Sequence, residues 1–288
     1  MQYALPLLVA LLLTLQKVAQ KRYHTHCASG ALLFSSLISF CAMAAFLTVT
    51  AVTGEWTWHP SFLLPALGFG LFHAMGTLFT ILAIQSGSLA RTTLVTSYSL
   101  LVPAAAGLFI LREPVKGSMA AGGCLLVASL WLTHHRKAEA GQPAVTLKWA
   151  LCAALGFTGS GLCSAVQKLA PHFVSVPLNQ NLFMTVALSI SAVALLTASL
   201  AVGETERGDT LRHGAPLALI CGLCNAGVNL LVLYLNARIS ASIMFPAISA
   251  GQIVLVCLYA HFICRERYTL QQWAGFAAGV LSLIFLNL

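Results

Sequence analysis

The sequence contains few charged residues. Asp, Glu, Lys and Arg make up 8% of its 288 residues, whereas an average soluble domain contains roughly 25%. Hydrophobic residues make up 59% of the chain, and the mean hydropathy is +0.88. A water-facing surface cannot be built from this composition, which excludes a soluble enzyme and a disordered chain. We therefore expect an all-α, multi-pass membrane protein in contact with the lipid bilayer.

The sequence also lacks a basic stripe. The net charge is +8, but Lys and Arg occur singly or in short groups between apolar runs. Basic residues in the short loops of a membrane protein give the same total. The charge therefore predicts no nucleic-acid partner.

Motifs for catalysis or for a cofactor are absent. We find no nucleophile–base–acid set and no phosphate-binding loop, and most of the nine cysteines fall inside apolar runs. His24, His26 and Cys27 lie close together, but we interpret them as a loop near the lipid headgroups rather than as a metal site. The sequence predicts no enzyme activity, no cofactor and no bound metal.

Long apolar runs fill most of the chain. A spanning helix needs about 20 mostly apolar residues, because the hydrocarbon layer is about 30 Å thick and a helix rises about 1.5 Å per residue. Ten runs fit this length. They are 3–21, 28–52, 60–86, 89–111, 117–134, 147–168, 177–202, 214–236, 241–264 and 270–288.

Short motifs recur in the same order in the two halves of the chain. The offsets between copies are about 150 residues, and only the loop lengths differ. The matched pairs are Arg112-Glu113-Pro114 with Arg265-Glu266-Arg267, Gly70-Leu71-Phe72-His73-Ala74 with Gly222-Leu223-Cys224-Asn225-Ala226, and Gln20-Lys21 with Gln167-Lys168. Because five is odd, two copies of five helices insert in opposite orientations, which predicts an inverted 5+5 repeat. We expect a first five-helix repeat at 1–135, a linker at 136–146 and a second repeat at 147–288.

These motifs, with a Gly-rich last helix in each half, resemble the EamA-like branch of the drug/metabolite transporter superfamily over essentially the whole chain. The resemblance implies a secondary transporter of polar small metabolites, with export of amino acids or related compounds as the favoured activity. It also implies that the protein is located in the cell (inner or plasma) membrane. We expect a monomer or a homodimer that works by alternating access, without a cofactor.

Other functions remain open at this point. The substrate is alternatively lipid-linked or drug-like. From another class, the chain is alternatively a membrane-embedded enzyme or a non-transporting assembly subunit. The small multidrug resistance relatives exchange protons for cationic drugs through a Glu inside the membrane. Here all seven acidic residues fall in or beside predicted loops, which argues against that mechanism.

The basic residues predict an orientation. Ten Lys and Arg residues lie in loops after odd-numbered segments, and four lie in loops after even-numbered ones. The positive-inside rule then places the odd loops in the cytoplasm and both termini outside. The ten-helix members of the family are usually described with both termini inside, so this sequence departs from that pattern.

Polar residues recur at helical spacing in four predicted spans. Within a span, each pair is three or four residues apart and therefore shares one face. The repeat pairs His73 and Thr77 with Asn225 and Asn229, and Thr96 and Ser99 with Ser249 and Gln252. Polar residues inside a membrane are costly, so matched polar faces predict a substrate cavity at the centre. The alternative is that they bond between helices as packing contacts.

Three further residues complete the predicted substrate site. Tyr98, next to Ser99, offers a ring for stacking. Gln16 and Lys17 lie well inside the first apolar run. Lys17 is predicted either to pair with an anionic or zwitterionic substrate or to carry a transported proton. The alternative is that its side chain extends to the nearer interface without a function.

Overall fold

The computed structural model describes residues 4–26, 30–112, 118–134, 146–204, 207–236, 241–263 and 268–285. Within these ranges all regular structure is helical and no strand occurs, which confirms the all-α class. The long helices are α1 (Ala4–His26), α2 (Ala31–Thr53), α3 (Leu63–Ser86), α4 (Leu89–Ser97), α5 (Leu101–Phe109), α6 (Ser118–His134), α7 (Leu147–Phe173), α8 (Gln180–Val202), α10 (Ala215–Asn236), α11 (Ala241–Phe262) and α12 (Leu270–Phe285). The short elements are η1 (Pro60–Phe62), η2 (Tyr98–Leu100), α9 (Arg207–Asp209) and η3 (Thr210–Gly214).

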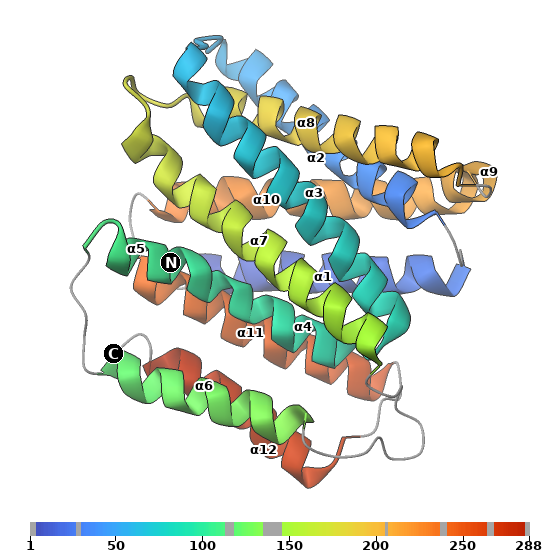
Figure 1. Cartoon of the computed structure of the whole chain (residues 1–288), viewed down its shortest axis with the longest axis vertical. Coiled ribbons are helices and arrows are strands. Elements are labelled where there is room, and N and C mark those ends of the chain that lie inside the picture. Colours follow the sequence, from blue (N-terminus) through green and yellow to red (C-terminus); the bar gives the residue numbers. More distant parts are fainter. Residues whose placement is uncertain are drawn as a thin grey trace.

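The long helices form one bundle in which successive segments run in alternating directions (Figure 1). Helix α3 packs along α7, and α1 packs along α10. Helix α2 packs along α8, and α6 packs along α12 at the lower edge of the view in Figure 1. Helices from the two halves of the sequence are therefore interleaved rather than separated.

Several helices are suited to a membrane. Five helical stretches of the described chain are long and apolar enough to cross one: Ala31–Thr53, Pro60–Ser86, Leu147–Phe173, Gln180–Val202 and Arg207–Leu235. Large apolar side chains point outward from these and other helices, as Leu71 of α3 and Leu200 of α8 do. A large number of exposed apolar side chains on long helices is unfavourable in water and favourable against lipid.

The segment predicted as one helix at 89–111 is interrupted. It consists of α4, the tighter 3₁₀ turn η2 and α5. Pro103 explains the break, because proline has no N–H to donate and its ring crowds the carbonyl four residues earlier, at Ser99. The apolar run predicted at 89–111 is therefore helical, but as three successive elements rather than as one helix.

The first helix is longer than predicted. Helix α1 continues to His26, so His24 lies in a helix rather than in the expected loop. Among the described residues no group of three His, Cys, Asp or Glu is placed to hold a metal. Cys27, the Glu113-Pro114 and Arg265–Arg267 motifs and nearly all of the linker 136–146 lie outside the described residues.

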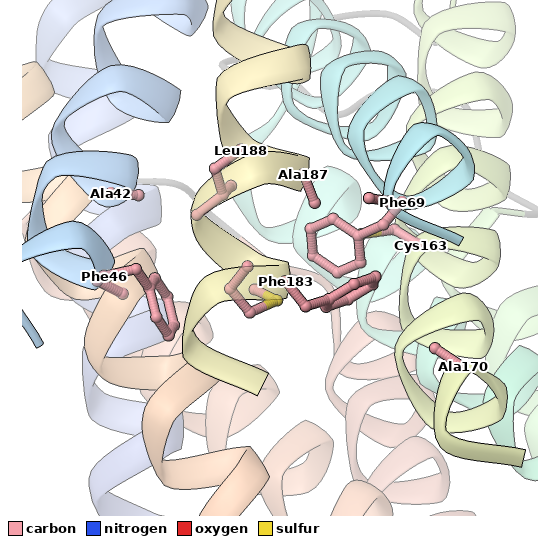
Figure 2. Close-up of a cluster of buried hydrophobic side chains, with 11 residues drawn as sticks. Ala42, Phe46, Phe69, Cys163, Ala170, Phe183, Ala187 and Leu188 are labelled. Atoms are coloured by element: carbon pink, nitrogen blue, oxygen red, sulfur yellow. The ribbon is translucent and has the colours of Figure 1, made fainter. Parts of the chain in front are cut away.

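The core consists of several clusters of buried side chains between helices. In the largest, α2 contributes Phe46, α3 contributes Phe69 and α8 contributes Phe183 (Figure 2). The rings of Phe69 and Phe183 meet edge to face with their centroids 6.1 Å apart, which is a favourable aromatic geometry. The cluster fixes α3 against α8, one turn from His73.

A glutamate in the loop after α8 caps the N-terminus of α2. Glu204 follows the left-handed Gly203 and accepts hydrogen bonds from Leu32 N at 3.0 Å and Leu33 N at 3.1 Å. Ser199 Oγ donates to the same carboxylate at 2.6 Å. A carboxylate at a helix N-terminus bonds free N–H groups and complements the helix dipole. This contact joins segments that lie 171 and 172 residues apart in the sequence.

Candidate functional site

A cavity of about 170 Å³ lies between α1, α3, α4, α7, α10 and α11, with η2 adding Ser99. Helices α3 and α7 can approach closely beside it because both have glycine there. A Cβ at Gly76 would lie 2.8 Å from Ser160 N. The wall combines apolar side chains with hydroxyl, amide, imidazole and ammonium groups. Its polar side chains are Gln16, Lys17, Gln20, His73, Thr77, Thr80, Thr96, Ser97, Ser99, Ser160, Ser164, Gln167, Asn225, Asn229 and Gln252.

Nine of the eleven predicted site residues lie in this wall. They are Gln16, Lys17, His73, Thr77, Thr96, Ser99, Asn225, Asn229 and Gln252. The helical spacing thus brings together side chains from both halves of the sequence. That they bind a solute remains a prediction.

Tyr98 and Ser249 lie elsewhere. The Tyr98 hydroxyl is 2.9 Å from Ser129 Oγ, and its ring packs in the buried cluster that includes Phe276 of α12. Ser249 Oγ donates to Ser97 O at 3.1 Å and so joins α11 to α4. Both residues therefore serve packing between helices in this structure, which is the alternative that the sequence left open.

Lys17 is the cation of the cavity wall. Its side chain is half-buried, and the neighbour with which it interacts electrostatically is the Cys221 thiol of α10. No carboxylate belongs to the described lining. The side chain therefore lines the cavity rather than pairing with a protein anion.

His73 is buried and belongs to a hydrogen-bond network. Its Nδ1 lies 3.0 Å from Ser191 Oγ of α8. Its Nε2 has no hydrogen-bond partner in the described part of the chain, although the Asn225 side chain lies beside the ring. Asn225 accepts from Asn229 Nδ2 through its backbone carbonyl at 2.8 Å and through its amide oxygen at 3.1 Å. Of the matched pair on α10, Asn229 is thus bonded to its own helix.

Sequence reasoning missed several lining residues, among which Gln20 and Gln167 stand out. Each has a buried amide atom, Gln20 Oε1 and Gln167 Nε2, without a partner among the described residues. The two residues are a matched pair of the repeat and lie near the ends of their predicted spans. Two signals indicate them: their recurrence, and a polar neighbour on the same helix face, since Gln20 lies four residues after Gln16 and Gln167 three residues after Ser164.

Comparisons with known proteins show the fold alone. No protein-family model matches the chain, and no curated protein is significantly similar to it. A solved structure described only as "Crystal structure of protein" is similar, with a TM-score of 0.65 and 14% sequence identity. The match covers 100% of this chain and 98% of that one. At this identity the likeness concerns the arrangement of helices and carries no information about activity.

Proposed function

We propose that the protein is a secondary transporter of small polar metabolites. Its ten helical segments cross the cell membrane as two inverted five-helix halves, as in the EamA-like transporters that the sequence resembles. The two halves rock about the central cavity, which opens to each side in turn. Amino acids or related compounds are the proposed substrates, and export is the proposed direction.

The packing of the helices supports the inverted repeat. A two-fold relation between the halves pairs α1 with α7, α2 with α8, α3 with α10, and α6 with α12. It therefore converts each contact between two helices into the contact between their counterparts. It converts the α3–α7 contact into the α10–α1 contact, and the α2–α10 contact into the α8–α3 contact; all four occur. It also brings α2 against α8 and α6 against α12, as observed.

Matched glycines make matched close approaches. A Cβ at Gly70 of α3 would lie 2.5 Å from Ala187 O of α8. A Cβ at Gly222 of α10 would lie 2.5 Å from Cys41 Cβ of α2. These glycines occupy the same place in the two sequence copies, and they face the helices that the two-fold relation exchanges. Two helices in equivalent places have thus kept the same packing device.

The observation that carries the transport proposal is the cavity itself. It lies between helices of both halves, and a cavity with polar side chains in its wall, inside an apolar bundle, is what a midplane site for a solute requires. A non-transporting assembly subunit has no need of such a space. Its volume of about 170 Å³ is below the roughly 300–1,000 Å³ typical of sites for drug-sized ligands, which favours small metabolites over drug-like or lipid-linked substrates.

Transport is tested with the purified full-length chain in liposomes. Labelled amino acids and other small metabolites are screened with and without a pH gradient, because the substrate, a proton or another ion supplies the driving force. We expect uptake or counterflow of at least one solute, lost in Lys17→Ala and retained in Lys148→Ala. Lys148 is a matched control because it is exposed at the beginning of α7. Failure of every solute to move under any gradient would contradict the proposal.

A further inference from the structure

A chain of buried hydrogen bonds leads from the cavity wall into the α2–α8 interface. It begins at His73 of α3, whose Nδ1 lies 3.0 Å from Ser191 Oγ of α8. Ser191 Oγ lies 3.1 Å from Ser39 Oγ of α2. Ser39 Oγ in turn donates to Ser35 O, one turn earlier in α2, at 3.2 Å. The chain therefore joins three helices and ends at a backbone carbonyl.

The carbonyl at the end of this series of hydrogen bonds determines which atom is the donor in each bond. A carbonyl oxygen only accepts, so Ser39 must use its single hydroxyl hydrogen on Ser35 O. Ser191 then donates to Ser39 and has no hydrogen left for His73. His73 must therefore donate from Nδ1, because all three bonds form together only in this direction. A neutral imidazole protonated at Nδ1 has an acceptor lone pair at Nε2.

Nε2 lies in a side chain that lines the cavity. It is buried and has no partner of good hydrogen-bond geometry among the described residues, and the Asn225 side chain is its polar neighbour. The same wall carries the Lys17 cation and no described carboxylate. A buried acceptor without a donor is costly, and a solute that supplies one recovers that cost.

We propose that Ser191 and Ser39 are positioning residues that hold His73 in the Nδ1–H form. Nε2 then accepts a hydrogen bond from an O–H or N–H group of the transported solute, whose carboxylate pairs with Lys17. The substrate class is a small amino or hydroxy acid. This inference rests on the transport function proposed above and adds the residues that select the substrate.

His73 Nε2 and the Lys17 ammonium discriminate against different substrate analogues. An acid without a hydroxyl or ammonium group leaves Nε2 unpaired, and we expect it to bind about five- to a hundred-fold more weakly than the matching amino or hydroxy acid. An amine without a carboxylate places a second cation near Lys17 and finds no counter-ion in the described wall. Its binding is expected to be undetectable. A site that reads a donor group in this way discriminates more strongly than one that reads apolar size alone.

The tautomer is tested by nitrogen NMR on isotope-labelled histidine in lipid nanodiscs, at mildly alkaline pH and without ligand. His73→Gln assigns the signal. In the wild type we expect Nδ1 to be protonated and Nε2 to be bare. Ser191→Ala and Ser39→Ala shift the population toward Nε2–H, Ser191→Thr preserves the wild-type signal, and Ser36→Ala leaves it unchanged. Ser36 is the matched control, since it donates across the same interface to Ala192 O at 2.9 Å and is not part of the chain. A wild-type Nε2–H signal would overturn the assignment.

The substrate class is tested with two isosteric series in binding and counterflow assays. The first is alanine, lactate, propionate and ethylamine; the second is phenylalanine, phenyllactate, phenylpropionate and phenethylamine. Amino and hydroxy acids are expected to bind in at least one series. The ratio of the affinity for a donor-bearing acid to the affinity for the matching simple acid should fall toward one in Ser191→Ala. Equal binding of simple and donor-bearing acids would sink the inference and leave the transport function standing. Transport of none of these compounds, with transport of other solutes, would sink the proposed class but not the function.

Discussion

Lys17 is the residue whose environment is hardest to explain by packing alone. An ammonium group in an apolar environment is costly unless an opposite charge or water compensates it. In the described part of the chain no carboxylate approaches it, and its side chain lines the cavity. Water in the empty cavity, or the anionic group of a solute, is then the natural partner. A charge of this kind weakens the fold, and the proposed transport function gives it a use when a solute fills the cavity.

Replacing Lys17 by Met should therefore separate stability from function. Met retains most of the apolar stem and removes the charge, so we expect the thermal unfolding midpoint in detergent to stay equal or rise. Transport should fall, with the KM for an acidic or zwitterionic solute raised roughly thirty-fold or more, since losing one partner of a buried charge pair costs about 2–5 kcal/mol. Lys17→Arg, which keeps the charge, should retain part of the activity. A lower midpoint together with lost transport would mean that Lys17 is structural.

The site shows what residue spacing does and does not predict. Pairs such as His73 and Thr77 were found because both periodicity and repetition indicate the same face, and both residues line the cavity. Tyr98 does not share the face of Ser99, because adjacent residues point about 100° apart in an α-helix and about 120° apart in a 3₁₀ turn such as η2. The neighbours Ser97 and Ser99 face the cavity, and the ring between them does not. The rotation of a helix about its axis is set by tertiary packing, which a single sequence does not contain.

At the scale of helices, close approach between α3 and α8 and between α2 and α10 depends on glycine. A methyl group at Gly70 would lie 2.9 Å from Ile190 Cβ as well as close to a backbone carbonyl. Backbone atoms cannot move aside as a flexible side chain does, so the helices would have to separate. His73 lies less than one turn further along α3, so such a separation reaches the cavity wall.

Gly70→Ala and Gly222→Ala are expected to destabilise the protein by about 1–3 kcal/mol each, the usual range for overpacking. Gly68→Ala is the control on the same helix, because its Cβ would meet only Val166 Cγ2 at 3.8 Å, an ordinary contact. Alanine also favours helix over glycine, so this control should be neutral or slightly stabilising. Unfolding in denaturant, followed by circular dichroism, measures the three variants. Equal stability of Gly68→Ala and Gly70→Ala would argue against the close packing.

The contact between the two halves at the beginning of α2 offers a second test at this scale. Glu204 caps two N–H groups of α2, whereas Glu55, which follows the left-handed Gly54 in the same way, is exposed and makes no side-chain hydrogen bond within the described residues. Glu204→Ala should cost about 0.5–2 kcal/mol as a lost cap, and Glu55→Ala about 0 to 0.5 kcal/mol as a surface change. The same unfolding assay compares them. A loss of similar size in both variants would show that loop charge, rather than capping, is responsible.

For the molecule as a whole, the pattern of apolar runs predicts the elements well and their termination less well. Helices occur at all ten predicted segments, and most bounds agree within a few residues. The clear exceptions are α1 and α7, which continue about five residues past the predicted ends. A polar sequence such as Lys21-Arg22 marks where a chain can leave the hydrocarbon, but a helix need not end there, because exposed polar residues are compatible with helical backbone. Composition thus predicts where apolar helices lie, whereas their ends depend on caps and packing.

The orientation of the bundle is a property of the whole chain, and the distribution of charge predicts it. The start of α1 and the end of α12 lie toward the same side as the α7–α8 connection, and the α8–α9 connection lies at the other side (Figure 1). The second side includes Lys21, Arg22, Lys148 and Arg207 at the ends of α1, α7 and α9. By the positive-inside rule we expect this basic side to face the cytoplasm. A reporter that is active only in the cytoplasm should therefore be inactive when fused after Leu288 and active when inserted within residues 136–146. An active reporter after Leu288 would place the termini inside, as in the family pattern. In that case the ten basic residues that follow the odd-numbered segments do not determine the insertion of this protein.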